Sequence, residues 1–366
     1  MEDRFFSPSF GNKPQVLVGR SNELRELTEG LDSKPGSKER ARLIIGQRGL
    51  GKTVLMLEVA DYAKSHDYIV ASPTIAKKGM EQKIIEKLLS SGNNILEHSR
   101  RRISGGAFGA LGFSVGIETE KPSKETGSFQ AKLSEICDEA AKHGKGVVIM
   151  LDEVQNNAYT EEVAVAYQEL VGEEKNIAMI MAGLPATISG VLNNRVLTFL
   201  TRSSKLYLEP INYTEIDTYY YKCFREMGIT LSEEQIMDAA VQTEGSPYLM
   251  QLIGHYITVL ADNDGFMDDT LYNRAISTAK KEYMNDLCEV ALHGISGGDM
   301  AFLRAMTDDP GSSKIQHVAD RMGVSSAYAQ TYKKRMMEAG LIEKVSRGEI
   351  RFAVPMLREY LVSHGP

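Results

Sequence analysis

Hydrophobic residues along this chain of 366 residues follow two different patterns. Between residues 41 and 208, short and wholly apolar runs alternate with stretches whose apolar positions recur every three to four residues. Runs of the first kind are typical of strands buried on both faces, and stretches of the second kind are typical of amphipathic helices. This alternation predicts an α/β fold with a mainly parallel sheet. The expected strands are 42–45, 68–72, 146–151, 177–181 and 205–208, and the expected helices are 53–65, 78–89, 128–142 and 160–172.

After residue 211 the pattern becomes purely helical. Apolar positions keep the helical period up to about residue 284, and Ser232 with Gln235 resembles a capping box at one helix start. The region is therefore predicted to be a bundle of helices. The expected helices are 213–227, 232–243, 247–261 and 268–284.

The last part of the chain changes pattern again. It predicts three short amphipathic helices, then two strands around a turn at Arg347-Gly348, then a final helix. Three helices followed by a two-stranded wing is the plan of a winged helix-turn-helix domain. The expected helices here are 298–307, 313–322, 325–339 and 356–363. The expected domains are 1–40, 41–210, 211–290 and 291–366.

Residues 100–126 interrupt the α/β region with a segment rich in glycine and small residues. One interpretation is a flexible or hairpin insertion without chemistry of its own. The other is that Arg100, Arg101 and Arg102 contact nucleic acid or a neighbouring subunit.

Composition and charge narrow the class of protein. A hydrophobic fraction of 42% and a charged fraction of 25% are typical of soluble globular proteins, and no apolar stretch approaches the ~20 residues that cross a bilayer. The first residues lack the pattern of a secretory signal, and Cys137, Cys223 and Cys288 lack metal-site spacing. We therefore expect a cytoplasmic protein with reduced thiols and no membrane partner.

The net charge of −7 is unevenly distributed. Residues 311–366 contain nine Lys and Arg against five Asp and Glu, a net of +4, so the remainder carries about −11. A basic segment on an acidic body indicates a local anionic partner.

The run GQRGLGKT at residues 46–53 completes the pattern G-x-x-x-x-G-K-[ST] between an expected strand and an expected helix. Glycines let the backbone N–H groups converge on phosphate oxygens at the start of the helix. Lys52 is expected to reach the β- and γ-phosphates, and the Thr53 hydroxyl to bind Mg²⁺. This Walker A motif predicts a site for ATP or ADP. The candidate residues are Gly46, Gln47, Arg48, Gly49, Leu50, Gly51, Lys52, Thr53 and Val54.

A second motif is the apolar run 146–151 that ends in Asp152 and Glu153. Such a strand delivers two carboxylates to the carboxyl edge of the sheet, beside the phosphate loop. As a Walker B motif, it predicts that Asp152 holds Mg²⁺ and that Glu153 is the general base that polarises the attacking water.

The chain resembles P-loop ATPases of the AAA+/STAND superfamily, close to origin-recognition-like ATP-binding proteins of bacteria and archaea. The resemblance rests on LVGRSNEL at 17–24, GQRGLGKT at 46–53, VVIMLDEVQ at 147–155, EGSPYLMQLIGHY at 244–256 and the expected winged helix. It implies that Val18, Gly19 and Arg20 lie against the nucleotide base. It also implies that Pro247 brings a helical lid to the nucleotide; the alternative is that this proline only starts a helix.

The sequence departs from the family at two positions. The run 179–185 lacks the Asn, Thr or Ser that many AAA+ proteins place there to sense the γ-phosphate, and the lid lacks a sensor-2 arginine. Both absences favour a slow switch over a processive motor. The family often places an arginine finger before the last strand, which makes Arg202, ahead of Arg195, the candidate catalytic cation from a neighbouring copy.

The expected third helix of the C-terminal domain is the candidate DNA-recognition helix. Its start is small and polar and could approach base edges, while its basic residues and the wing could meet phosphates. Winged helices of STAND proteins also dock proteins, so that alternative stays open. The candidate DNA-binding residues are Ser326, Gln330, Lys333, Lys334, Arg335 and Arg347.

The sequence thus predicts a slowly hydrolysing ATPase that acts as a nucleotide-dependent switch, binds ATP or ADP with Mg²⁺, and is coupled to duplex DNA. The alternative is a signalling or assembly scaffold that associates through its ATPase face and whose winged helix docks protein.

Overall fold

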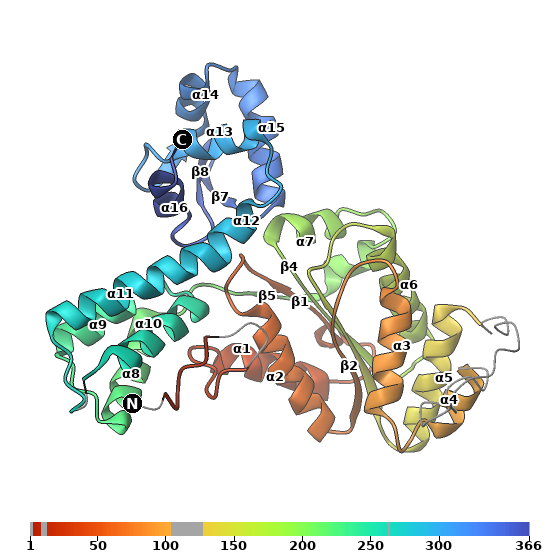
Figure 1. Cartoon of the computed structure of the whole chain (residues 1–366). Helices are drawn as coiled ribbons and strands as arrows, with labels where there is room; N and C mark the ends of the chain where they lie inside the picture. The colour runs from red at the N-terminus through yellow and green to blue at the C-terminus, as the bar shows by residue number, and fades with distance from the viewer. Residues whose placement is uncertain (1–2, 9–12, 104–126, 263, 366) are drawn as a thin grey trace, which may run out of the picture.

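The computed structural model describes residues 3–8, 13–103, 127–262 and 264–365. Its core is a five-stranded, entirely parallel sheet with the strand order β2-β3-β4-β1-β5 (Figure 1). All five expected strands are confirmed, each within a few residues of its expected ends. The strands are β1 (Ala41–Ile45), β2 (Tyr68–Ile75), β3 (Gly146–Asp152), β4 (Ile177–Gly183) and β5 (Ser204–Tyr207).

The sheet is covered by helices on both faces, and every residue of β1, β3 and β4 is buried. In β1, for example, Ile44 packs toward α1 and α2, whereas Leu43 and Ile45 pack toward the opposite layer. This burial explains the continuous apolar runs in the sequence. One face carries α1 (Ser21–Asp32) and α2 (Lys52–Ser65), and the other carries α3 (Met80–Ser91), α5 (Phe129–Lys142), α6 (Ala158–Gly172) and α7 (Pro185–Leu192).

Shorter helical segments complete the core: η1 (Lys38–Arg40), α4 (Glu97–Ile103) and η3 (Thr198–Arg202). Helix α4 includes the first residues of the expected insertion, so residues 100–103 are helical, and Arg100 Nη2 donates to the Leu89 carbonyl inside the fold. Most of the insertion, residues 104–126, lies outside the described residues.

The helical bundle follows the sheet, and we call it the lid. The expected capping box is confirmed, because the Ser232 hydroxyl accepts from Gln235 N–H and the Gln235 side chain accepts from Ser232 N–H. A π-helical turn, η4, and the short α12 continue α11 without a break. The elements are α8 (Tyr213–Met227), α9 (Glu233–Gln242), α10 (Pro247–Leu260), α11 (Asp269–Tyr283), η4 (Met284–Glu289) and α12 (Val290–Leu292).

The remaining residues form a C-terminal unit of helices around a small antiparallel sheet of order β6-β8-β7. The expected helix over 313–322 is wrong at its start. Residues 312–314 form a strand that pairs Ser312 with Arg351, a long-range pairing that local periodicity does not reveal. The elements are α13 (Gly297–Met306), β6 (Ser312–Lys314), α14 (Ile315–Met322), α15 (Ser326–Glu338), β7 (Ile342–Ser346), β8 (Glu349–Phe352) and α16 (Leu357–Ser363).

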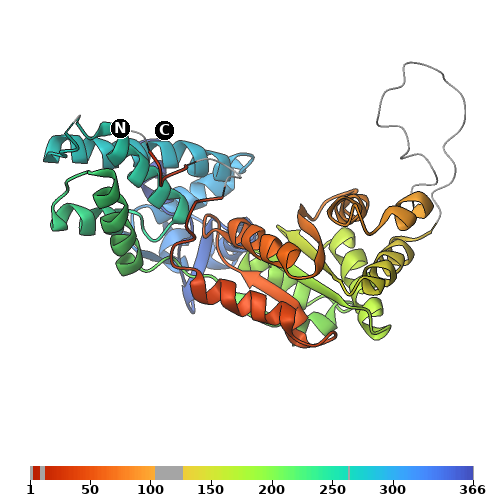
Figure 2. The ribbon, with the colours of Figure 1, turned by 90° about the horizontal axis from the view of Figure 1, so that it is seen from below.

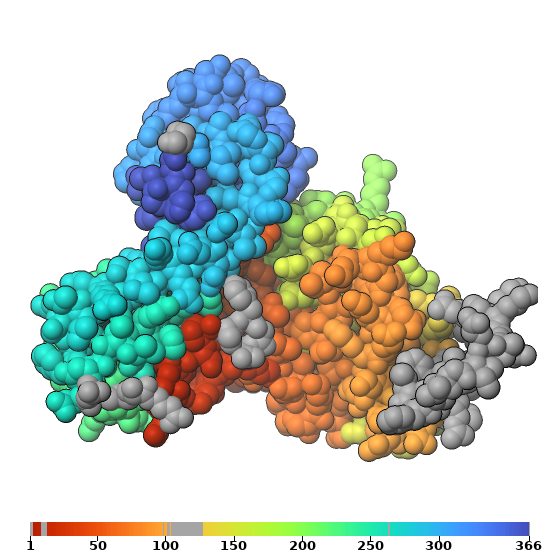
Figure 3. Space-filling model, in the orientation of Figure 1, coloured from red at the N-terminus to blue at the C-terminus, as the bar shows by residue number. Residues whose placement is uncertain are grey.

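The lid and the C-terminal unit share one continuous apolar core. Buried residues of the lid, such as Ile276 and Cys288, belong to the same cluster as Phe302, Leu303 and Leu357 of the C-terminal unit. The two faces of the sheet have apolar clusters of their own. In space, the C-terminal unit lies above the junction between the lid and the sheet domain (Figure 3), and the N-terminal segment runs beside the lid helices before it reaches α1 (Figure 2).

None of the described helices is long and apolar enough to cross a lipid bilayer.

Candidate nucleotide site

The run GQRGLGKT forms a tight loop between β1 and α2 at the carboxyl edge of the sheet. Gly49 and Gly51 have φ angles of 79° and 81°, a left-handed conformation in which glycine is the residue without a steric penalty. Helix α2 starts at Lys52, and its N-cap, Gly51, makes no side-chain capping hydrogen bond. The N–H groups of the first turn therefore remain available for an anion, as a phosphate-binding loop requires.

The side chain of Lys52 folds back over the loop. Its Nζ donates hydrogen bonds to the carbonyl oxygens of Gly46, at 2.9 Å, and Gln47, at 2.7 Å. Burial lowers the pKa of Lys52 from 10.5 to about 8; the charge of Asp152 opposes this shift, and that of Arg48 adds to it. The ammonium group therefore lacks a full counter-charge, which favours an anionic ligand beside it.

The end of β3 brings two carboxylates to the same place. Asp152 is buried, and its Oδ2 accepts a hydrogen bond of 2.5 Å from the Thr53 hydroxyl. Its Oδ1 accepts from the N–H of Glu153, at 2.9 Å. Glu153 has a φ of 52°, an uncommon conformation for a side chain of this size. Strain of this kind is often found at functional sites, and here it turns Glu153 out of the strand direction.

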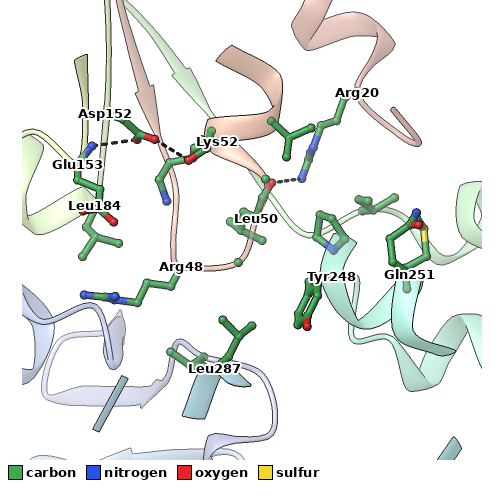
Figure 4. A pocket seen from close by; sticks show the side chains of 18 of the residues that line it. Arg20, Arg48, Leu50, Lys52, Asp152, Glu153, Leu184, Tyr248, Gln251 and Leu287 are labelled. Carbon is green, nitrogen blue, oxygen red and sulfur yellow. Dashed lines mark hydrogen bonds between the residues drawn. The ribbon is translucent and has the colours of Figure 1, made fainter. Parts of the chain in front are cut away.

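A cavity of about 470 Å³ opens between these groups and the lid. Its two ends differ in chemistry (Figure 4): Asp152 and Glu153 lie at one end, and Tyr248 and Gln251 of the lid lie at the other, with Lys52 and Leu50 between them. The cavity brings together most of the predicted site residues. These are Val18, Arg20, Arg48, Gly49, Leu50, Gly51, Lys52, Thr53, Val54, Asp152, Glu153 and Pro247.

Three of the residues predicted to bind the nucleotide do not line this cavity. Gly46 and Gln47, at the start of the loop, border a second cavity of about 140 Å³ instead. Gly19 has a φ of 66°, and a side chain there would collide with Ile211 and Glu215. The backbone conformation and the close packing therefore account for a glycine at this position.

Arg20 is 4% exposed and acts on the loop through the backbone. Its Nη2 donates to the carbonyl oxygens of Glu209, at 2.6 Å, and Leu50, at 3.4 Å, while Nη1 pairs with Glu23. These contacts attach the N-terminal segment to the phosphate loop. Arg20 is therefore a positioning residue at the rim of the cavity.

The lid contributes residues that the sequence reasoning missed. A Cβ on Gly49 would lie 3.6 Å from the hydroxyl of Tyr283, which also contacts Ser246, and a Cβ on Gly51 would lie 3.5 Å from Pro247. Pro247 therefore lies against the phosphate loop and is also the first residue of α10, and its contact with the nucleotide stays a prediction. Tyr248 and Gln251 follow Pro247 by one and four positions, so they could have been found from their place in the first turns of the same helix. Tyr283 and Leu287 lie too far along the chain for any local signal.

The C-terminal unit also reaches the phosphate loop. Gln47 Nε2 donates to Glu343 Oε2 at 2.9 Å, and Arg48 Nε donates to the carbonyl oxygen of Ala339 at 3.2 Å. Glu338 and Val354 line the large cavity. The site is therefore formed by all three parts of the molecule, which the sequence did not reveal.

Many AAA+ proteins carry a polar residue that senses the γ-phosphate at the carboxyl end of the strand that corresponds to β4. This chain has no polar residue at that position. Leu184 and Pro185 follow Gly183, and the first hydroxyl group is that of Thr187, which donates to the Leu184 carbonyl and lines the cavity. Leu184 instead packs against Gly340 of the C-terminal unit.

The candidate finger residues lie away from this site. Arg202 ends η3 just before β5 and is exposed. Because β5 runs parallel to β1 and Ser204 pairs with Arg42, Arg202 is at the amino edge of the sheet, opposite the phosphate loop. Arg195 is exposed in the segment after α7. Arg202 cannot serve the loop of its own chain, and its action on a neighbouring copy stays a prediction.

The predicted DNA-binding residues lie on α15 and on the turn between β7 and β8. Arg335 is used inside the unit: its Nε and Nη2 donate to Asp299, the shortest contact being 2.6 Å, and its guanidinium stacks over Tyr332. The Arg335 side chain is nevertheless 44% exposed, so a phosphate would compete with Asp299 for it, and its contact with DNA stays a prediction. The other candidates remain accessible to different degrees, with Ser326 and Lys333 half-buried and Gln330, Lys334 and Arg347 exposed.

The arrangement of oxygen atoms suits Mg²⁺. The Thr53 hydroxyl and the Asp152 carboxylate are hard oxygen donors held 2.5 Å apart, and Mg²⁺ in such sites completes its shell with water and substrate phosphates. Among the described residues, no cluster of three or more His, Cys, Asp or Glu side chains could bind a metal.

A parallel sheet with a glycine loop, an adjoining lysine and a strand ending in Asp-Glu defines a P-loop nucleoside-triphosphate-binding protein. Residues 16–178 match the AAA ATPase domain family, and residues 285–361 match a domain family of unknown function, DUF8462. Residues 16–178 are thus similar to AAA ATPase domains, and the sheet domain has the fold of a P-loop nucleotide-binding protein.

Solved structures of similar fold cover nearly the whole chain. A Walker-type ATPase of Pyrococcus abyssi is 16% identical with a TM-score of 0.68, over 97% of this chain and 99% of that one. The ORC2 protein of Aeropyrum pernix, in its ADPNP–ADP complexes, is 13% identical with a TM-score of 0.62, over 98% of both chains. At these identities the likeness concerns the fold. No curated protein matches the sequence.

Proposed function

We propose that this protein is an ATP-dependent switch, in which the occupant of the phosphate loop controls the position of the lid and the C-terminal unit. One observation carries the proposal: the loop residues Gln47 and Arg48 are hydrogen-bonded directly to the C-terminal unit, at Glu343 and Ala339. A ligand that changes the loop therefore changes a contact of the C-terminal unit.

The architecture favours movement of the lid and the C-terminal unit as one body. They share a continuous apolar core, whereas the C-terminal unit meets the phosphate loop through two hydrogen bonds and the packing of Leu184 on Gly340. Separating the shared core would expose many buried side chains, whereas separating the polar contacts costs about 1 kcal/mol per hydrogen bond. The contacts at the loop are thus the ones that open.

The residues of the loop support ATP binding with slow hydrolysis. Lys52 and the free N–H groups at the start of α2 would bind the phosphates, and Glu153 would take the proton of the attacking water. Thr53 and Asp152 would hold Mg²⁺, which would neutralise phosphate charge. Turnover is expected to be slow because Leu184 occupies the sensor position and because the lid lacks a sensor-2 arginine.

We propose duplex DNA as the partner of the C-terminal unit, with Lys333 and Arg347 as the main phosphate contacts. Neither has an ion-pair partner among the described residues, whereas Arg321, Arg335 and Arg351 are paired with Asp309, Asp299 and Glu343. Lys334 forms only an exposed pair with Glu338, 3.9 Å apart. The small start of α15 leaves Ser326 and Gln330 to approach base edges.

A second function is favoured by one observation. Tyr328, on the exposed side of α15, is 54% exposed. An exposed aromatic ring is typical of protein interfaces, so α15 could dock a partner protein, with the chain acting as an assembly scaffold.

The experiment that tests the proposal is ATP binding and turnover, each with and without duplex DNA, on the wild type and two variants. Lys52→Ala should lose ATP binding, and Glu153→Gln should bind ATP but retain it without turnover. Turnover by Glu153→Gln at the wild-type rate would exclude the general-base role. If the protein does not bind duplex DNA even at low salt, or binds it equally well with and without ATP, the assembly scaffold becomes the favoured function.

A further inference from the structure

The structure assigns a role to Arg48 that rests on the proposed function: it distinguishes ATP from ADP by exchanging the Ala339 carbonyl for the terminal phosphate. This exchange would release the C-terminal unit from the phosphate loop. Arg48 occupies a variable position of the loop motif, so the motif itself assigns it no role.

The first observation is the direction of the side chain. Arg48 extends from the loop toward Leu184, on the side of the cavity where Asp152 and Glu153 lie and away from Tyr248 and Gln251 (Figure 4). The start of α2 would hold the phosphates, and Thr53 and Asp152 would hold their Mg²⁺, so the last phosphate would lie at the carboxylate end of the cavity. Arg48 is therefore a second cation at the end where ATP and ADP differ.

The second observation is that the guanidinium has unused hydrogen-bonding capacity. Arg48 is exposed, and its Nε makes a hydrogen bond of 3.2 Å to a neutral carbonyl oxygen, that of Ala339. Across the described parts of the chain, neither of its Nη groups has a hydrogen-bond partner. A phosphate group offers charge-assisted and bidentate contacts, which are stronger than one long bond to a carbonyl.

The third observation is electrostatic. Arg48 lies close enough to Lys52 for its charge to lower the pKa of that lysine. Two neighbouring cations repel each other until an anion lies between them, so a terminal phosphate would be favoured by both side chains. ADP, which lacks this group, would satisfy Lys52 and leave Arg48 on Ala339.

The consequence for the C-terminal unit follows from its few contacts with the loop. Among the described residues, the hydrogen bonds between the loop and this unit are those of Arg48 to Ala339 and of Gln47 to Glu343. Loss of the first would leave one hydrogen bond and the contact between Leu184 and Gly340. ATP would thereby shift the population toward an undocked C-terminal unit, whereas ADP would not.

The test compares Arg48→Gln with Glu343→Ala. For each protein, the affinities for a non-hydrolysable ATP analogue and for ADP are measured by calorimetry. Docking is followed by energy transfer between fluorophores on Asn193→Cys in the sheet domain and Gln330→Cys in the C-terminal unit, two exposed positions. Thermal melting checks that each variant is folded.

We expect Arg48→Gln to bind ADP as the wild type does. The ratio of its affinity for the ATP analogue to its affinity for ADP should fall about tenfold. Its energy transfer should no longer respond to the analogue. Glu343→Ala should be less docked without nucleotide and should keep or increase the preference for the ATP analogue, because its Arg48 remains and there is less docking to oppose binding. The role of Arg48 is overturned if Arg48→Gln keeps both the preference and the response. Failure of the proposed function has a different signature, in which the wild type itself binds no nucleotide or shows no change in energy transfer.

Discussion

The hydroxyl of Thr53 donates a hydrogen bond to Oδ2 of Asp152, and the two oxygens lie 2.5 Å apart although the residues are 99 positions apart in the chain. This contact joins the phosphate loop to the end of β3. It places the two side chains that would share the Mg²⁺ ion of a bound nucleotide.

Removal of either partner should therefore weaken the effect of the metal on ATP binding. We expect Asp152→Asn and Thr53→Ala each to lower Mg²⁺-dependent ATP affinity by about tenfold or more, because each loses a contact to a charged group. Calorimetric titrations with Mg²⁺ and with EDTA measure the difference. Thr53→Ser keeps the hydroxyl and serves as the control. Equal metal dependence in Asp152→Asn and the wild type would contradict this assignment.

The lowered pKa of Lys52 predicts a pH-dependent affinity. Burial lowers this pKa to about 8 in the free protein, and the charge of ATP should raise it, since an anion favours the protonated amine. Above pH 8 binding must then take up a proton, so the dissociation constant should rise with pH, by up to about tenfold per pH unit. For the free protein, the native state binds fewer protons than the unfolded state between pH 8 and 10.5. Lys52 should therefore add to stability as the pH rises through this window.

Calorimetry at pH 7, 8 and 9 in two buffers of different ionisation enthalpy measures this proton uptake. Lys52→Arg is the matched control, because a guanidinium stays charged throughout this range. An affinity for ATP that stays constant from pH 7 to 9 would rule out a titrating Lys52.

Phe6 and Gly254 predict a coupled effect on stability. The Phe6 ring is 4% exposed and packs against Tyr220 and Phe224, and a Cβ on Gly254 would lie 2.2 Å from its nearest ring atom. Phe6→Ala should cost about 3–5 kcal/mol. Gly254→Ala should cost about 1–3 kcal/mol because the ring must move.

The double variant separates this contact from a general effect of helix substitution. Once the ring is absent, the alanine methyl group has space, so the double variant should be more stable than the sum of the two losses predicts. Urea unfolding followed by tyrosine fluorescence is suitable, since the chain has no tryptophan. Strict additivity would show that the two residues act independently.

Variants of the ion pair between Arg335 and Asp299 should change the stability of the C-terminal unit more than its affinity for DNA. The Asp299 side chain is 8% exposed and also accepts from the Ser296 hydroxyl at the start of α13, so Asp299→Ala should remove both contacts and lower the stability of this unit. Arg335→Ala should likewise affect stability more than DNA affinity.

Lys333→Ala and Arg347→Ala should have the opposite profile. Each should weaken duplex binding and reduce the salt dependence by about one phosphate contact, with little change in melting temperature. Fluorescence anisotropy at several salt concentrations gives the slope. If Arg335→Ala reduces the slope as strongly as Lys333→Ala does, Arg335 contacts phosphates after all.

Much of the fold was predictable because its signals are local. The apolar runs of β1, β3 and β4 reflect burial on both faces, and the glycines and Lys52 of the loop reflect backbone geometry within eight residues. The capping box at Ser232 and Gln235 is equally local. Where a structural requirement acts between near neighbours, the sequence pattern expresses it directly.

The features that the sequence failed to predict have a common cause. The strand at 312–314 depends on β8, the use of Arg335 depends on Asp299, and the distance of Arg202 from the loop depends on strand order. None of these relationships has a fixed spacing in the chain.

By itself, the sequence determined that this chain folds around a parallel sheet with a phosphate loop and an acidic strand end, because those features are written in contiguous residues. Only the tertiary structure decided that Tyr283 and Leu287 complete the cavity and that Gln47 and Arg48 contact the C-terminal unit. The physical reason is that these contacts join segments up to about 300 residues apart, whose meeting depends on how the lid and the C-terminal unit pack into one apolar core.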